Sequence, residues 1–219
     1  DLSSKIYVIG NEKDYYFKVL LIKKKKLGNE WADKLYHLSY AMVDLPSGKM
    51  KSREGTVVDA DDLMDEITTA AAEETSKLGK VEEFSNDELK QLYETLGFGA
   101  LKYFILKVDP EKRMLFNPAE SVEIHGNTGP YIQYVHARIC SVIKRASQIQ
   151  QLSGYKNMAL EAVVNMNDKE RELAINILRF KETVENAAEK FSPAIVANYV
   201  YELAKNFNQF YHENSIISE

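Results

Sequence analysis

Cysteine is nearly absent from this chain of 219 residues, because Cys140 is the only one. A single cysteine cannot close an internal disulfide, so nothing indicates an oxidising compartment. No apolar run approaches the roughly 20 residues that span a bilayer, and the first ten residues lack the charged start and long apolar core of a signal peptide. The sequence therefore predicts a cytoplasmic protein that does not span a membrane.

An excess of positive charge is also missing. Lys and Arg number 28 against 33 Asp and Glu, which gives a net charge of -5 and a sequence pI near 5.5. Proteins that coat DNA or anionic membranes without specificity need a broad basic excess, so both partners are disfavoured. A nucleic acid could bind only at a local basic patch. The hydrophobic fraction of 45% is sufficient for a buried core in one large domain or two modest ones.

The first residues have the pattern of a parallel α/β unit. Residues 5–9, "KIYVI", predict a buried strand that is closed by Gly10. A helical pattern follows and ends in lysines 23–26 and Gly28, as expected from the helix dipole and from the usual C′ residue. Residues 36–45 predict a second strand. Two parallel strands cannot bury both faces of a sheet, so we expect the end of a larger α/β domain.

Long helical patterns replace the strand signals after residue 66. Helix starts are indicated by two capping boxes and by two prolines suited to first turns: Ser85 with Glu88, Asn167 with Glu170, Pro130, and Pro193. The acidic run of residues 59–66 fits a helix start better than a metal site, because it lacks the ligand spacing of a calcium loop. We expect a mainly α protein, no metal site, and structural roles for its four histidines.

A basic loop follows the second strand. The stretch "LPSGKMKSREGTVV" places flexible glycines around a cluster of polar and basic side chains: Lys49, Met50, Lys51, Ser52, Arg53. Open α/β sheets bind ligands beyond the carboxyl ends of their strands, and mobile lysines there suit the phosphates of a triphosphate. The spacing is not that of a P-loop. A solvent-exposed charged hairpin is the alternative, and the residues alone do not decide between the two.

The stretch of residues 126–146 predicts a helix with two stripes. One is apolar and should face the core: Ile132, Val135, Ile139, Val142, Ile143, Ala146. The other combines aromatic rings with guanidinium groups: Tyr131, Tyr134, Arg138, Arg145. Such a stripe suits unstacked bases and phosphates of single-stranded RNA. The alternative is that the tyrosines complete the core and the arginines are solvated.

The basic loop carries a family resemblance. "GKMKSREGTVV" resembles the KMSKS signature of class I aminoacyl-tRNA synthetases, and "LSYAMVDLPSGKMKSREGTVVDADDLMDEI" is similar to its arginyl-tRNA synthetase form. The resemblance implies that Lys49, Met50, Lys51, Ser52 and Arg53 serve ATP, with Met42 and Val43 near adenine. The signature's second lysine falls on Ser52 in an ungapped alignment and on Lys51 with one deletion.

Further stretches carry the same resemblance. "YVIGNEKDYYF" is similar to the family's strand, Gly and acidic residue, which implies that Gly10 and Glu12 lie near the ribose, although Tyr16 replaces an expected histidine. "NTGPYIQYVHAR" and "YELAKNFNQFYHENSI" resemble the family's helical anticodon-binding domain. The resemblance then assigns a set of tRNA contacts: Tyr131, Tyr134, Arg138, Arg145, Asn208, Tyr211. In the last helix, a core stripe is expected from Val196, Val200, Leu203, Phe207 and Phe210.

The resemblance implies a ligase that joins arginine to its tRNA with ATP and Mg²⁺, as a monomer. It divides the chain into the end of a Rossmann-like catalytic domain (1–66), a connecting helical region (67–125) and a helical anticodon-binding domain (126–219). The family's HIGH signature is not found here, so we expect a fragment that is inactive alone. Two alternatives stay open: a free-standing tRNA-binding module without catalysis, and a helical scaffold without an RNA role.

Overall fold

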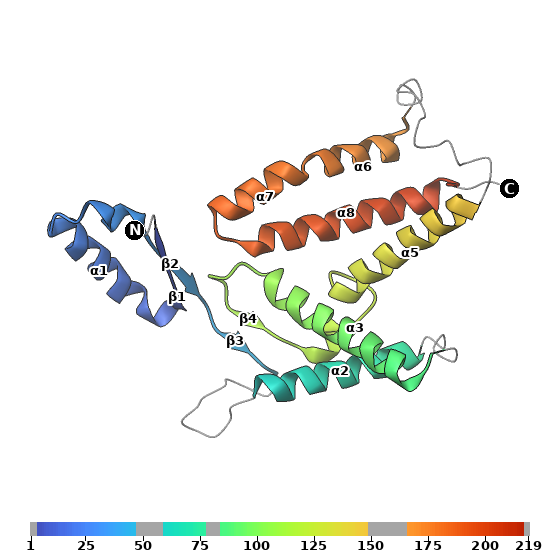
Figure 1. Cartoon of the computed structure of the whole chain (residues 1–219), viewed down its shortest axis with the longest axis horizontal. Helices are drawn as coiled ribbons and strands as arrows, with labels where there is room; N and C mark the ends of the chain where they lie inside the picture. Colours follow the sequence, from blue (N-terminus) through green and yellow to red (C-terminus); the bar gives the residue numbers. More distant parts are fainter. Residues whose placement is uncertain (1–3, 47–58, 78–83, 149–165, 217–219) are drawn as a thin grey trace.

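The structure is a computed structural model and describes residues 4–46, 59–77, 84–148 and 166–216. In chain order the elements are β1 (Lys5–Gly10), η1 (Asn11–Lys13), α1 (Asp14–Lys26), η2 (Glu30–Lys34), β2 (Leu35–Tyr40), β3 (Val43–Asp44), α2 (Ala60–Lys77), α3 (Asn86–Leu106), β4 (Met114–Leu115), α4 (Pro118–Ser121), α5 (Gly129–Gln148), α6 (Asp168–Leu178), α7 (Phe180–Glu189) and α8 (Pro193–Glu213). The β1–β2 pair and α1 occupy one end, the β3–β4 pair lies between them and the remaining helices, and helices make up most of the rest (Figure 1). The fold is mainly α, as the sequence predicts.

The amino-terminal unit is a β–α–β crossover. Strands β1 and β2 pair in parallel, with Gly10 opposite Tyr40 at their carboxyl ends. Phe17 of α1 is buried and stacks on His37 of β2, with ring centroids 4.2 Å apart. Helix α1 ends at Lys26, and Gly28, the residue after the C-cap Leu27, has a φ of 76°, the left-handed conformation expected of a C′ glycine. The predicted strand, helix and strand are confirmed.

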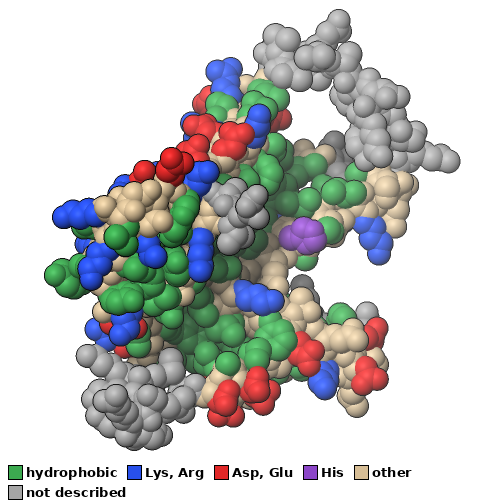
Figure 2. All heavy atoms as spheres, turned by 60° about the vertical axis from the view of Figure 1, so that its left-hand side comes forward, with side chains coloured by type: hydrophobic (Ala, Val, Ile, Leu, Met, Phe, Trp, Pro, Cys, Tyr) green, Lys and Arg blue, Asp and Glu red, His purple; other side chains and the backbone are tan. Residues whose placement is uncertain are grey.

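The prediction of a buried first strand is wrong. Val8 is 61% exposed and Ile6 is also exposed, because α1 packs through Phe17 only on the side of the sheet that carries Tyr7 and His37. Figure 2 shows basic side chains and exposed apolar side chains intermixed on the face that its view brings forward. The opposite side of this small sheet therefore presents apolar side chains to solvent.

The predicted second strand is divided in two. Strand β2 ends at Tyr40, the Ala41 amide donates to the Pro110 carbonyl over 2.7 Å, and β3 then pairs in parallel with β4. Strand β4 has only two residues, which is too short for the alternating pattern that marks a strand in a sequence. The break at Ala41 redirects the chain from the amino-terminal unit toward the helices.

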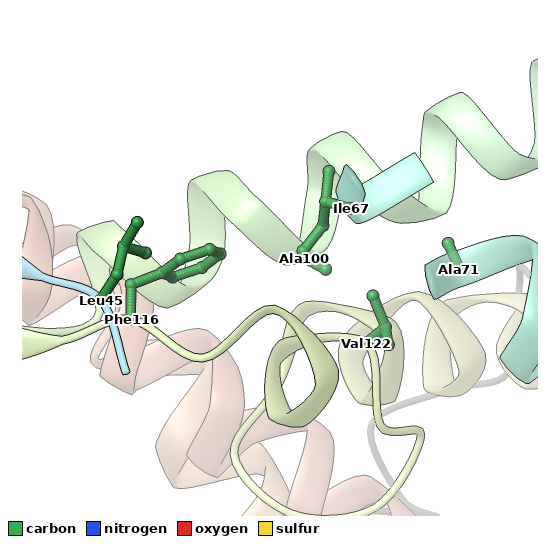
Figure 3. Close-up of a cluster of buried hydrophobic side chains, with 6 residues drawn as sticks. All are labelled: Leu45, Ile67, Ala71, Ala100, Phe116 and Val122. Carbon is green, nitrogen blue, oxygen red and sulfur yellow. The ribbon is translucent and has the colours of Figure 1, made fainter. Parts of the chain in front are cut away.

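A buried cluster joins the strands to the helices (Figure 3). Its members come from β3, α2, α3, β4 and α4 and their ends: Leu45, Ile67, Ala71, Ala100, Phe116, Val122. Phe104 meets Phe116 edge to face with ring centroids 5.2 Å apart. Helices α2 and α3 approach closely at Gly97, where an added Cβ would lie 3.1 Å from the Thr68 Cα. This core fixes the points at which the basic loop leaves and re-enters the fold.

The carboxyl-terminal helices form a bundle in which α5 lies beside α3 and α8, while α6 and α7 pack on α8 (Figure 1). Both predicted capping boxes are present, and Pro130 and Pro193 lie in first helical turns. Within the described residues, no helix combines the length and hydropathy needed to cross a bilayer.

Two predicted core stripes need correction. On α5, Val135 is 2% exposed but Ile143 is 56% exposed, whereas the other stripe residues are partly buried, so the described helices do not cover the whole stripe. On α8, the buried residues are Ala194, Ala204 and Asn206. The larger apolar side chains predicted for the core of α8 are only partly buried. Small side chains let neighbouring helices approach, and the larger ones then pack around the margins of the contact.

Replacement of Gly129 by Ala should destabilise the bundle, although Ala is the better helix former. An added Cβ would lie 2.6 Å from the Gly99 carbonyl oxygen, and backbone cannot move aside easily. We expect the free energy of unfolding to fall by about 1–3 kcal/mol in urea denaturation. Gly99→Ala is the matched control, because its Cβ would meet only the flexible end of Gln133 at 2.5 Å. Equal losses for the two variants would contradict this packing.

The capping box of α3 should give a pH-dependent contribution to stability. Glu88 accepts from the Ser85 amide and hydroxyl, at 2.9 and 2.7 Å, and these bonds lower the pKa of its carboxyl below the ordinary 4.5. A lowered folded-state pKa means that the contribution is present above pH 4.5 and is lost as pH falls through the folded value. The difference in unfolding free energy between the unaltered chain and Glu88→Gln should therefore shrink at low pH. Asp87→Asn, on the same turn, should not reproduce this change.

Candidate functional site

Two of the residues predicted to lie near the nucleoside, Gly10 and Glu12, are at the carboxyl edge of the β1–β2 sheet. Gly10 ends β1 and is buried, and Glu12 follows it on η1. A Cβ at position 10 would collide with the Glu12 carboxylate, so glycine allows that side chain to fold back over the strand end. Met42 is exposed just beyond β2, and Val43 is partly buried in β3. Gly10 and Glu12 thus lie at the edge where open α/β sheets bind their ligands, Met42 follows the end of β2 by two residues, and Val43 belongs to the separate β3–β4 pair.

The predicted phosphate-binding residues lie outside the described residues: Lys49, Met50, Lys51, Ser52, Arg53. The described residues on either side belong to the packed part of the fold. Leu45 is buried in the core, and α2 begins at Ala60, with Asp61 and Asp62 in its first turn. The prediction of a helix start in the acidic run is confirmed.

Sequence reasoning missed Arg113. Its Nε and Nη2 form a two-pronged contact with the Asp44 carboxylate, and the Nη2 bond measures 2.9 Å. The bond to Asp44 raises the pKa of the Arg113 guanidinium. Because Asp44 is the last residue of β3, this contact holds the strand that leads into the basic loop. The only sequence signal was the short apolar run at 114–116, which gives no partner for β3.

A small cleft of about 430 Å³ beside α1 contains polar groups without an arrangement for nucleophilic catalysis. The Ser39 hydroxyl donates to Asp14 Oδ1 over 2.6 Å, and His37 Nε2 lies 3.1 Å from the Ile9 carbonyl oxygen. The serine is thus bonded to the carboxylate and not to the imidazole. Across the described part of the chain, no group of three or more His, Cys, Asp or Glu side chains could hold a metal ion.

The structure brings five of the six predicted tRNA-binding residues together across α5 and α8. We call them the Arg138 cluster: Tyr131, Tyr134, Arg138, Asn208, Tyr211. Arg138 donates to Asn208 Oδ1 and to the Tyr134 hydroxyl, and its guanidinium carbon lies 4.7 Å from the ring centroids of both Tyr134 and Tyr211. Asn208 Nδ2 donates to the Tyr131 hydroxyl over 3.3 Å. These partners are uncharged, so the cluster keeps the positive charge of the arginine.

The members of the Arg138 cluster differ in exposure. Tyr134 is 45% exposed and also borders an apolar cleft of about 620 Å³ between α3 and α5. Tyr131 is partly buried and packs on Tyr201, with ring centroids 5.6 Å apart. Arg145 lies two turns beyond Arg138 on α5, is exposed, and borders a small cavity with Tyr211. Arg145 therefore stands apart from the cluster.

Residues 2–117 match the model of the class I tRNA synthetases (R), catalytic domain. The chain belongs to this family. Residues 132–219 match a second model, the DALR anticodon binding domain, which contains four of the five members of the Arg138 cluster. The two matches follow each other along the chain in the order that the sequence resemblance implies.

Relatives and solved structures agree with this membership of the class I tRNA synthetase (R) family. The arginine–tRNA ligase of Flavobacterium psychrophilum is 51% identical over the whole chain, which covers 35% of that relative. The arginine–tRNA ligase of Bacteroides thetaiotaomicron is 50% identical over 98% of the chain, again covering 35% of the relative. The arginyl-tRNA synthetase structure from Thermus thermophilus matches 98% of this chain and 34% of its own, with 25% identity and a TM-score of 0.80. The chain thus spans about a third of the length of these relatives.

Proposed function

We propose that this chain is part of an arginine–tRNA ligase and supplies the phosphate-binding loop and the anticodon-reading surface. The single observation that carries the proposal is the Arg138 cluster, which combines aromatic faces, an amide and a retained positive charge on two adjoining helices. This chemistry suits unstacked RNA bases. It lies in the part of the chain that resembles an anticodon binding domain.

For the catalytic part, we assign ATP as the substrate that meets the carboxyl edge of the sheet. Gly10 and Glu12 would lie near the ribose, with Met42 and Val43 near adenine. The loop residues would meet the phosphates: Lys49, Met50, Lys51, Ser52, Arg53. Support comes from the position of Gly10 and Glu12 at the carboxyl end of β1, from Met42 two residues after the end of β2, and from the contact of Arg113 with Asp44 in β3.

The proposed reaction begins with attack of the arginine carboxylate on the α-phosphate, which forms an acyl-adenylate while pyrophosphate leaves. The tRNA hydroxyl then takes the arginyl group and releases AMP. Such in-line displacement depends on positioning and on stabilising the charge that develops on the leaving group, which mobile lysines can provide. Mg²⁺ would be held chiefly by phosphate oxygens, since the described residues offer no cluster of three metal-binding side chains.

Ribonuclease footprinting tests the RNA assignment. Added chain should protect the anticodon loop of arginine-accepting tRNA, because the aromatic faces of the Arg138 cluster would cover its bases. Tyr134→Ala should remove this protection without loss of helicity in circular dichroism. Tyr15→Ala, which alters an exposed tyrosine of α1, is the matched control and should leave the footprint unchanged. Protection confined to regions outside the anticodon loop would contradict the proposal.

A further inference from the structure

The guanidinium of Arg138 is committed to partners within the protein. Nη1 donates to the Asn208 side chain on α8, and Nη2 donates to the Tyr134 hydroxyl on α5. The same group lies 4.7 Å from the ring centroids of both Tyr134 and Tyr211. Both terminal nitrogens therefore have protein acceptors, and the planar group is engaged by an aromatic ring from each helix.

Asn208 extends this contact to a third tyrosine. Its Oδ1 accepts from Arg138, and its Nδ2 donates to the Tyr131 hydroxyl over 3.3 Å. The orientation of the amide is thus determined on both sides, with oxygen toward the guanidinium and nitrogen toward the phenol. One arginine and one asparagine link the positions of three tyrosine rings across the α5–α8 contact.

We propose that Arg138 is a positioning residue that holds the Tyr134 and Tyr211 rings in place for RNA bases, and that it is not a phosphate ligand. The inference rests on the proposed function, in which the cluster meets tRNA. An arginine that binds phosphate presents its fork of N–H groups to the oxygens. Here each terminal nitrogen already donates to a protein acceptor, and Tyr134, whose ring lies against the guanidinium, is 45% exposed. Rings that are ordered before binding lose less conformational freedom when a base stacks on them.

Arg145 provides a comparison on the same helix. It is exposed, and among the residues that the structure describes its guanidinium has no hydrogen bond or ion pair. An exposed arginine beside a base-stacking surface is suited to a backbone phosphate. The two arginines should therefore contribute to tRNA binding in different ways, one through the tyrosines and one through charge.

The salt dependence of binding separates these roles. Each phosphate contact adds about 0.7–0.9 to the magnitude of the slope of log K against log salt concentration. Arginine-accepting tRNA is titrated with the full chain at several salt concentrations. Arg138→Gln should lower the affinity about tenfold with the slope unchanged, because the effect acts on the rings. Arg145→Gln should reduce the slope by about one contact.

Two further variants distinguish positioning from charge. Arg138→Lys keeps the charge but lacks the planar fork, so it should lose as much affinity as Arg138→Gln. Asn208→Ala removes no charge and should also weaken binding several-fold at constant slope. Both variants should keep the helix content of the unaltered chain, which circular dichroism measures. If Arg138→Gln unfolds, Arg138→Lys and Asn208→Ala still decide the question.

Rescue of binding by lysine, or a reduced slope in Arg138→Gln, would show a phosphate contact and overturn the positioning role. Full affinity in Arg138→Gln and Asn208→Ala would overturn it as well. Failure of the proposed function gives a different result. In that case the unaltered chain would bind tRNA without regard to its anticodon, and the positioning role would fall with it.

Discussion

Tyr134→Ala should lower the affinity of the chain for arginine-accepting tRNA by about 5- to 150-fold, because stacking of one base on an aromatic ring contributes about 1–3 kcal/mol. Tyr134 is the most exposed ring of the Arg138 cluster, and the arginine holds it in position. The measurement is a titration of labelled tRNA followed by anisotropy at fixed salt concentration.

Tyr134→Phe refines this result. It keeps the stacking surface and removes only the hydroxyl that accepts from Arg138. We expect a smaller loss of affinity than for Tyr134→Ala. Equal tRNA affinity of the unaltered chain and Tyr134→Ala would contradict base stacking on Tyr134 and would leave this tyrosine with a structural role only.

The second large effect concerns catalysis. The 219-residue chain alone should show no arginine-dependent exchange between ATP and pyrophosphate, since it spans about a third of its relatives' length and carries no HIGH signature. A chimera that places this chain in the corresponding position of the Flavobacterium psychrophilum relative should show exchange, because the two are 51% identical over the segment. Exchange by the chain alone would contradict the account. No exchange by a folded chimera would favour the tRNA-binding module without catalysis.

The same chimera tests the basic loop. Replacement of both Lys49 and Lys51 by Ala should lower kcat by about 100-fold or more, because their charge stabilises the leaving pyrophosphate. The single variants then show which position corresponds to the signature's second lysine. Lys23→Ala and Lys26→Ala, at the end of α1, are charge-matched controls and should retain the rate. Unchanged kcat in the double variant would contradict a role in catalysis and favour the alternative, a solvent-exposed charged hairpin.

Local signals in the sequence predicted much of the fold. The C′ glycine at position 28 and the two capping boxes each depend on contacts within a few residues, so their chemistry is readable directly. The five residues of the Arg138 cluster were predicted as tRNA contacts from a helical stripe and a family resemblance. That Arg138 bonds to Asn208, seventy positions away, depends on how α5 crosses α8, which no local pattern reports.

Burial and short pairings could not be predicted from local pattern. Ile143 belongs to an apolar stripe, yet the described helices leave it 56% exposed. Val8 is apolar in a strand but has α1 only on the other side of its sheet. Strand β4 and the Arg113–Asp44 contact arise when distant segments meet. In each case the burial or the pairing depends on which distant segment packs against the residue, and not on the residue type alone.

The central claim, that the α5–α8 surface reads the anticodon, is tested most directly by comparing two tRNAs. The chain is titrated at fixed salt concentration with arginine-accepting tRNA and with the same tRNA altered only in its anticodon. The account predicts tighter binding to the unaltered tRNA and loss of that preference in Tyr134→Ala. Equal, weak binding to both would contradict it.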